Sequence, residues 1–166
     1  MRHKLIVIGA STGGPGHLHK ILESLPTSFT SSIVIAQHIN HIFVDGIVES
    51  LSSTCNIPVL AGCDGMQIAA NSAVIIKGPF VNEIQRDGIL FRLRVLGDIS
   101  DDYSPSIDRL FMSVARLGDL SNVMGVLLTG IGSDGARGLL EMRRTGAITL
   151  AESEKTPERS PESAQL

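Results

Sequence analysis

The sequence predicts an α/β fold: a doubly wound, mostly parallel sheet with an appended antiparallel β-hairpin. Short uninterrupted apolar runs alternate with stretches whose apolar residues recur every three to four positions. Such runs are typical of parallel strands buried on both faces, and such stretches are typical of the helices that cross between them. In the middle of the chain, an Asp-Gly pair separates two strand-like segments, which is a strong hairpin signal.

The first half of the chain has the pattern strand, helix, strand, helix. Residues 5–8 are an apolar run, and Gly14-Pro15 follows with proline at a favourable first helical position. The apolar residues that then share one helical face are Leu18, Ile21, Leu22 and Leu25. Residues 32–36 form a second apolar run, and a second helical stripe follows at Val44, Ile47, Val48 and Leu51.

The middle of the chain differs from this rhythm. Residues 58–97 contain short strand-like pieces and turn signals, and Asp87-Gly88 lies between residues 80–86 and 89–95. In the second of these segments, apolar residues alternate with Arg92 and Arg94. The pattern predicts an antiparallel hairpin added to the parallel sheet.

The α/β rhythm then returns. Ser104-Pro105 opens a helix that Gly118 closes. Residues 123–128 predict another buried strand, and a glycine-rich turn over residues 129–135 leads into a helix that reaches about Arg144. Residues 147–150 predict one more strand.

We expect residues 1–151 to form one domain and residues 152–166 to form a polar tail that is disordered or altered, because that tail has almost no apolar content. The net charge of −3 argues against nucleic-acid binding. No apolar run approaches the roughly 20 residues that cross a bilayer, and no signal-peptide core follows the N-terminus. Two cysteines are too few for a disulfide scaffold or a four-ligand zinc site. We therefore expect a cytoplasmic protein without direct membrane insertion.

The segment Gly9-Ala10-Ser11-Thr12-Gly13 matches G-x-S-x-G between a predicted strand and a predicted helix. In that context a serine hydroxyl projects above the sheet as a nucleophile, and the helix N-terminus offers N–H groups to an oxyanion. A structural glycine turn or a phosphate-binding loop is the alternative. The Walker lysine and the dinucleotide G-x-G-x-x-G fingerprint are both missing from this turn, which weakens the nucleotide interpretations.

A serine nucleophile needs a base and a carboxylate that orients the base. His38 comes just past the second predicted strand, and Asp134 lies in the glycine turn after residues 123–128. Taken alone, His38 is typical of a loop histidine and Asp134 of an acid at a helix start. All three side chains nevertheless follow the carboxyl ends of predicted parallel strands, where open α/β sheets bind ligands. The sequence alone does not show that these strands are neighbours.

Four ordered motifs resemble the catalytic domain of the chemotaxis protein-glutamate methylesterases, the CheB type. They cover residues 8–14, Gln37-His38, residues 104–111 and residues 128–136, and the resemblance extends from about residue 4 to about residue 151. It implies that Ser11, His38 and Asp134 form a catalytic triad. It also implies a serine hydrolase that removes methyl esters from receptor glutamates and deamidates receptor glutamines.

The resemblance implies further site residues and partners. The backbone N–H groups of Thr12 and Ile131 would hold the oxyanion, with Gly13 and Gly132 beside them in the oxyanion and substrate-binding region. The family usually has methionine where this chain has Ile131. No metal and no cofactor is expected. The protein substrate would be the cytoplasmic helices of methyl-accepting chemotaxis receptors, and the family's receiver domain has no counterpart in this chain.

Two other functions stay open from the sequence. One is a catalytically impaired, stand-alone domain that keeps the fold and binds a receptor or signalling partner; the altered tail after residue 151 suggests it. The other is an esterase with another substrate, because a triad fixes the reaction type but leaves the ester open.

Overall fold

The computed structural model describes residues 4–98, 104–128 and 132–152. Within them, a parallel sheet has the strand order β3 (Val59–Ala61), β5 (Ser72–Ile75), β2 (Ser32–Gln37), β1 (Leu5–Ala10), β8 (Val123–Leu127) and β9 (Ile148–Ala151). A second, antiparallel sheet has the order β4 (Gln67–Ile68), β7 (Leu90–Asp98) and β6 (Phe80–Asp87). These sheets confirm the predicted fold class.

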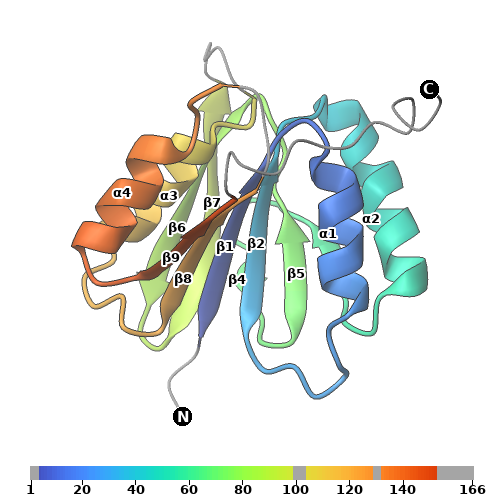
Figure 1. Cartoon of the computed structure of the whole chain (residues 1–166), viewed down its shortest axis with the longest axis horizontal. Helices are drawn as coiled ribbons and strands as arrows, with labels where there is room; N and C mark the ends of the chain where they lie inside the picture. Colours follow the sequence, from blue (N-terminus) through green and yellow to red (C-terminus); the bar gives the residue numbers. More distant parts are fainter. Residues whose placement is uncertain (1–3, 99–103, 129–131, 153–166) are drawn as a thin grey trace, which may run out of the picture.

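Helices cover both faces of the parallel sheet (Figure 1). One face carries α1 (Gly14–Glu23) and α2 (Val44–Thr54). A short 3₁₀ turn, η1 (His41–Phe43), leads directly into α2. The other face carries α3 (Ile107–Ala115) and α4 (Ala136–Arg144), and the small sheet packs against α3 on this side. The chain is therefore layered as helices, sheet, then helices with the small sheet.

The core consists of two apolar clusters, one on each face of the parallel sheet. Side chains of β1 alternate between them: Leu5 and Val7 belong to the cluster under α3 and α4, and Ile8 and Ala10 to the cluster under α1 and α2. This explains why the strand shows no polar alternation, since both of its faces lie under helices.

The middle of the chain contains three short strands besides the two strands of the predicted hairpin. The hairpin is present as β6 and β7, with Asp87 opposite Leu90 and with Gly88 in the left-handed region at φ +62°. β4 adds a third strand to it, and β3 and β5 extend the parallel sheet. These three strands have two to four residues each, too few to show a period.

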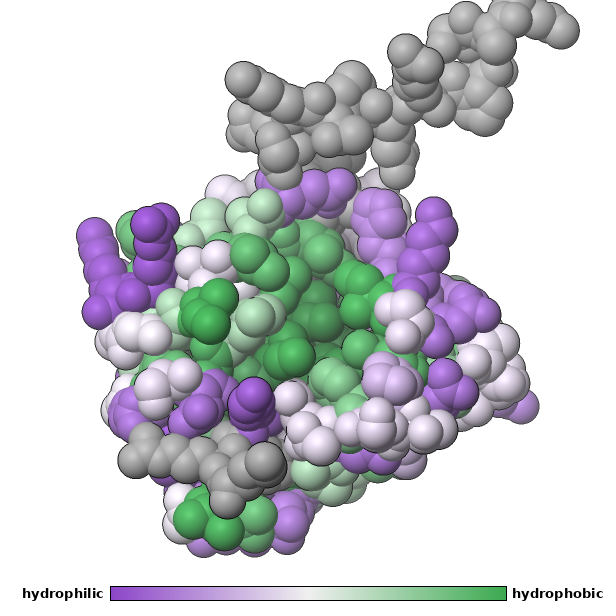
Figure 2. All heavy atoms as spheres, turned by 60° about the horizontal axis from the view of Figure 1, so that its bottom comes forward, coloured by the Kyte–Doolittle hydropathy of each residue, from purple (hydrophilic) through white to green (hydrophobic). Residues whose placement is uncertain are grey.

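The outer edge of the parallel sheet at β9 leaves apolar side chains exposed. Ile148 is 57% exposed and Leu150 is 54% exposed. Figure 2 shows apolar side chains gathered in a hollow at the centre of the face that is turned forward in that view. Residues 153–166, most of the predicted polar tail, lie outside the described part of the chain. Among the described helices, none is long and apolar enough to cross a membrane.

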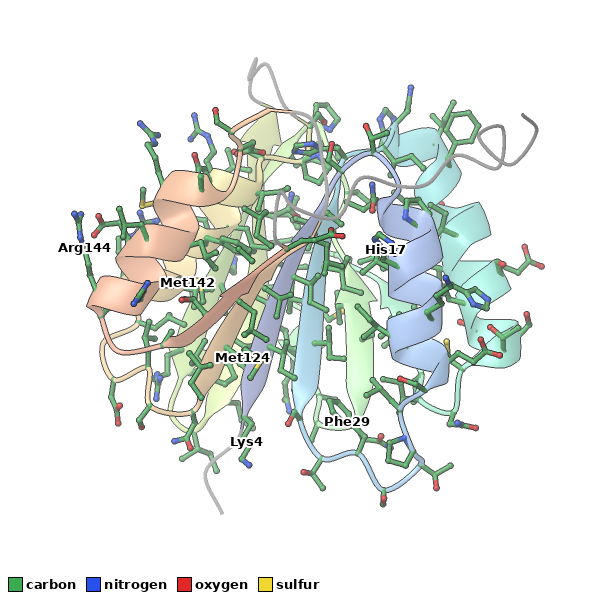
Figure 3. All side chains as sticks on the ribbon, in the orientation of Figure 1. Lys4, His17, Phe29, Met124, Met142 and Arg144 are labelled. Carbon is green, nitrogen blue, oxygen red and sulfur yellow. The ribbon has the colours of Figure 1, made fainter. Side chains whose placement is uncertain are left out.

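The two helices on the α3 side pack closely because glycines lie at their contacts. A Cβ on Gly138 of α4 would lie 2.5 Å from the Phe111 Cβ and 2.9 Å from the Asp108 carbonyl oxygen of α3. Under α4, Gly125 of β8 makes room for Met142, which is fully buried (Figure 3).

We predict that Gly138→Ala destabilises the fold by about 1–3 kcal/mol, because the added methyl group meets backbone and Cβ atoms that cannot move aside easily. The matched control is Gly16→Ala in α1, where an added Cβ has no neighbour within 4 Å. That control gains helix propensity and stabilises by about 0.5–1 kcal/mol. Urea unfolding of both variants measures the difference. Equal effects in the two helices would contradict this description of the α3–α4 contact.

Candidate active site

The three candidate residues follow neighbouring strands. β2, β1 and β8 are adjacent and parallel, and Ser11, His38 and Asp134 come after the carboxyl ends of β1, β2 and β8. The chain leaves β1 toward β2 on one side, whereas β8 pairs with β1 on the other side. The three side chains therefore lie at a topological switch point, where doubly wound sheets bind ligands.

A chain of hydrogen bonds links the three side chains. His38 Nδ1 lies 3.1 Å from Ser11 Oγ, and His38 Nε2 lies 2.8 Å from Asp134 Oδ2. An ionised carboxylate only accepts hydrogen bonds, so the proton of the neutral imidazole lies on Nε2. The lone pair of Nδ1 then faces the Ser11 hydroxyl, which is the arrangement that a general base needs.

The N-terminus of α3 holds the Asp134 carboxylate. Oδ2 accepts a hydrogen bond from the Ile107 N–H at 2.7 Å, and Oδ1 accepts one from the Asp108 N–H at 2.8 Å. The Ser106 hydroxyl lies 3.4 Å from Oδ1. The first N–H groups of a helix have no partner within the helix, so a carboxylate satisfies them and meets the positive end of the dipole.

These contacts decide the charge of Asp134, whose side chain is only 4% exposed. Burial raises the pKa of this carboxyl group, but hydrogen bonds from His38 and from the backbone N–H groups of Asp108 and Ile107 outweigh burial. The pKa of Asp134 therefore lies below its ordinary value, and the carboxylate is charged at neutral pH.

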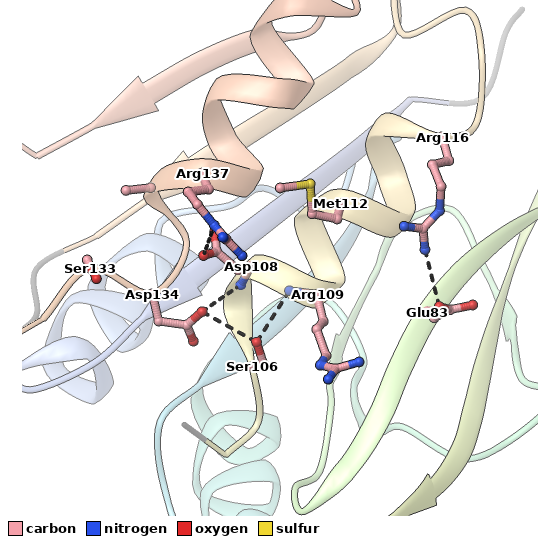
Figure 4. A pocket seen from close by; sticks show the side chains of 10 residues that line it. Glu83, Ser106, Asp108, Arg109, Met112, Arg116, Ser133, Asp134 and Arg137 are labelled. Carbon is pink, nitrogen blue, oxygen red and sulfur yellow. Dashed lines mark hydrogen bonds and ion pairs between the residues drawn. The ribbon is translucent and has the colours of Figure 1, made fainter. Parts of the chain in front are cut away.

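A second carboxylate, on α3, accepts a hydrogen bond from the N-terminal part of α4 in a similar way. Asp108 in the first turn of α3 accepts a hydrogen bond from the Gly138 N–H of α4 at 2.7 Å, and it lies 3.5 Å from Arg137 Nε (Figure 4). Asp134 thus caps α3 and Asp108 caps α4. The sequence shows Asp108 only as an acid near a predicted helix start and gives no sign of its connection to the site.

Gln37 ties the serine turn to the histidine loop. Its Nε2 donates to the Ser11 carbonyl oxygen at 2.9 Å and to the His38 carbonyl oxygen at 3.2 Å, and the residue is 3% exposed. A Cβ on Gly14 would lie 2.2 Å from Gln37 Oε1, so a side chain there would displace the amide. The sequence analysis names Gln37 only as part of the Gln37-His38 motif and predicts no contact for it. The one sequence feature that could have indicated a role is that this polar residue ends an otherwise apolar strand.

The end of β1 and the turn that follows it both need glycine. A Cβ on Gly9 would lie 2.3 Å from Ile107 Cγ2, and Gly13 occupies the N-cap of α1 at φ +82°. Thr12 and Gly13 are exposed beside Ser11. Gly132 is exposed at φ +108°, and Ile131 lies outside the described residues. Across the described part of the chain, no group of three or more His, Cys, Asp or Glu side chains is placed to hold a metal ion.

Comparisons with a family model and with curated proteins agree on one family. The sequence model of the CheB methylesterase family matches residues 6–162. A protein-glutamate methylesterase/protein-glutamine glutaminase from Rhodospirillum rubrum is 40% identical over 92% of this chain and 42% of its own length. A protein of the same description from Yersinia pestis is 41% identical over 91% of this chain and 43% of its own length. The chain spans less than half of these curated relatives.

A solved structure shares the fold. The crystal structure of the Thermotoga maritima CheB methylesterase catalytic domain matches with a TM-score of 0.86 at 29% identity. The match covers 94% of this chain and 82% of that one.

The contacts of Asp134 predict a pH-dependent contribution to stability. Because its pKa is lowered on folding, the stabilisation is fully present above the unfolded value of about 4 and is lost as the pH falls through the folded value. We expect Asp134→Asn to cost about 2 kcal/mol at pH 7 and less as the pH falls below about 4. Urea unfolding at both ends of this range measures the difference.

The control for this experiment is Asp45→Asn. The Asp45 side chain is 72% exposed and makes a surface ion pair with Lys77, so the substitution should change stability little at any pH. A cost of Asp134→Asn that stays constant from about pH 7 to about pH 3 would contradict the assignment.

Proposed function

The chain belongs to the CheB methylesterase family, and we propose that it is a serine hydrolase that removes methyl esters from glutamate side chains of chemotaxis receptors. We propose that it also deamidates receptor glutamines by the same route. The observation that carries the proposal is the hydrogen-bond chain from Ser11 through His38 to Asp134. The descriptions of the relatives name both reactions.

In the proposed first half-reaction, Ser11 Oγ attacks the carbonyl carbon of the glutamate ester. His38 Nδ1 takes the hydroxyl proton, because its lone pair faces Oγ at 3.1 Å. Asp134 stabilises the imidazolium that forms and keeps the ring oriented through Nε2. When the tetrahedral intermediate collapses, His38 gives the proton to the departing oxygen. Methanol leaves, and the glutamate is joined to Ser11 as an ester.

In the second half-reaction, a water molecule attacks this acyl-enzyme. His38 takes a proton from the water and returns it to Ser11 Oγ as the bond between Oγ and the acyl carbon breaks. The products are a glutamate carboxylate and the free serine. With a glutamine substrate, the first leaving group is ammonia, and the remaining steps are the same.

Backbone N–H groups around Ser11 are the proposed oxyanion donors. Thr12 and Gly13 are exposed at the N-terminal end of α1, where N–H groups and the helix dipole favour negative charge. We propose a second donor from the glycine turn that contains Ile131 and Gly132. The proposed mechanism uses protein groups alone, and no metal or cofactor takes part in it.

The proposed substrates are the cytoplasmic helices of methyl-accepting chemotaxis receptors, and the proposed place of action is the cytoplasm. The support for both is membership of the CheB methylesterase family. Removal of the methyl ester restores a negative charge on the receptor, which is the chemical change that adaptation of the receptor would use.

We predict that methanol release from methylated receptor membranes falls at least about a thousandfold in Ser11→Ala, because the nucleophile is gone. Asp134→Asn should lower the rate by about a hundredfold or more, because a neutral amide at this position no longer stabilises the imidazolium. Ser53→Ala, which changes an exposed serine on α2, is the matched control and should keep full activity.

Three results would refute the proposed function. Activity that survives in Ser11→Ala would exclude the serine mechanism. A folded chain that hydrolyses small esters but releases no methanol from receptor membranes would point to another ester. No hydrolysis of either substrate would favour a binding domain.

A further inference from the structure

A cavity of about 640 Å³ opens beside the Asp134 carboxylate, between α3, α4 and β6 (Figure 4). We name it the α3–α4 groove. Its walls carry charged side chains and one methionine: Glu83, Asp108, Arg109, Met112, Arg116 and Arg137. Because Asp134 lines it too, the groove adjoins the hydrogen-bond chain that leads to Ser11.

The acidic side chains of the groove already have partners. The Asp134 side chain is 4% exposed and accepts hydrogen bonds from His38 and from the first N–H groups of α3. Asp108 is 17% exposed and accepts from the Gly138 N–H. Glu83 is 28% exposed and pairs with Arg116. Each of these negative charges therefore already has a partner within the protein, and each side chain is less than a third exposed.

The arginines, in contrast, face the solvent. Arg116 is 64% exposed and uses Nη2 for Glu83 at 3.2 Å. Arg137 is 81% exposed and reaches Asp108 only at 3.5 Å, through Nε. A guanidinium carries five N–H donors, so each of these pairs leaves most of the donors unused. Arg109 is exposed on the same wall.

Ion pairs between exposed side chains are weak, because water screens the attraction between the two charges and both side chains lose conformational freedom. A carboxylate that enters the groove can therefore recruit Arg116 and Arg137 without breaking a buried contact. Guanidinium groups also match carboxylates in a two-point geometry. The most exposed charges of the groove are thus cationic, although the formal charges of its walls cancel.

We propose that the α3–α4 groove binds a carboxylate side chain of the protein substrate, next to the glutamate whose ester reacts at Ser11. The inference rests on the proposed function and adds a preference: acidic segments bind better than neutral ones. Arg116 and Arg137 act as specificity-determining residues that hold the substrate. They take no part in the bond-breaking step, so small esters do not use them.

Binding tests the proposal without any turnover. A fluorescein-labelled, alanine-rich peptide carrying glutamates is titrated against the full chain with Ser11→Ala, beside the same peptide with glutamines. We expect the glutamate peptide to bind about tenfold more tightly, and the preference to disappear in the double variant Arg116→Gln, Arg137→Gln. The control is Arg143→Gln with Arg144→Gln in the last turn of α4, which changes the net charge equally outside the groove.

Each outcome decides the proposal. The proposal is supported if the double variant of Arg143 and Arg144 keeps the preference for the glutamate peptide and the double variant of Arg116 and Arg137 loses it. Equal binding of both peptides, or equal losses in both double variants, overturns it and indicates no groove-specific effect. Hydrolysis of a small neutral ester by the groove variants with Ser11 intact should equal that of the unmodified chain. Methanol release by the unmodified chain tests the proposed function separately, so the two can fail independently.

Discussion

The hydrogen bonds between the Asp134 carboxylate and the first N–H groups of α3 are the interaction on which the rest of the site depends. Together with the hydrogen bond from His38, they lower the pKa of this buried carboxyl group and keep it charged. The charged carboxylate in turn decides which nitrogen of His38 carries the proton. That choice places a lone pair opposite Ser11 Oγ. The helix end therefore supplies the electrostatic support that the serine needs, although α3 contributes no side chain to the hydrogen-bond chain itself.

The sheet brings the other two side chains to the same point. β2, β1 and β8 lie side by side, so the turns after them meet at one edge. Glycines let the neighbouring elements approach: Gly9 leaves room for Ile107, and Gly138 leaves room for α3 against α4. Close packing on the α3 side and the position of Asp134 are thus parts of one arrangement, because α3 must lie against β1 for its first N–H groups to reach the carboxylate.

The sequence predicted the α/β fold and the hairpin because those depend on local patterns, such as the unbroken apolar run of β1 and the Asp-Gly pair before β7. It also singled out Ser11, His38 and Asp134, whose catalytic role stays a prediction. It could not assign β3, β4 and β5, which are too short to show a period. It missed the contacts of Asp134 with α3 and of Gln37 with two carbonyl groups, because these depend on how separate segments meet and leave no local pattern.

The position of the proton on His38 is the most direct test of how the site works. Nitrogen-15 NMR of the imidazole ring, recorded where His38 is neutral, distinguishes a protonated Nε2 from a protonated Nδ1. We expect the proton on Nε2, bonded to Asp134, and an unprotonated Nδ1 toward Ser11. A neutral ring protonated on Nδ1 would contradict this, because the nitrogen next to the serine hydroxyl would then be unable to accept its proton.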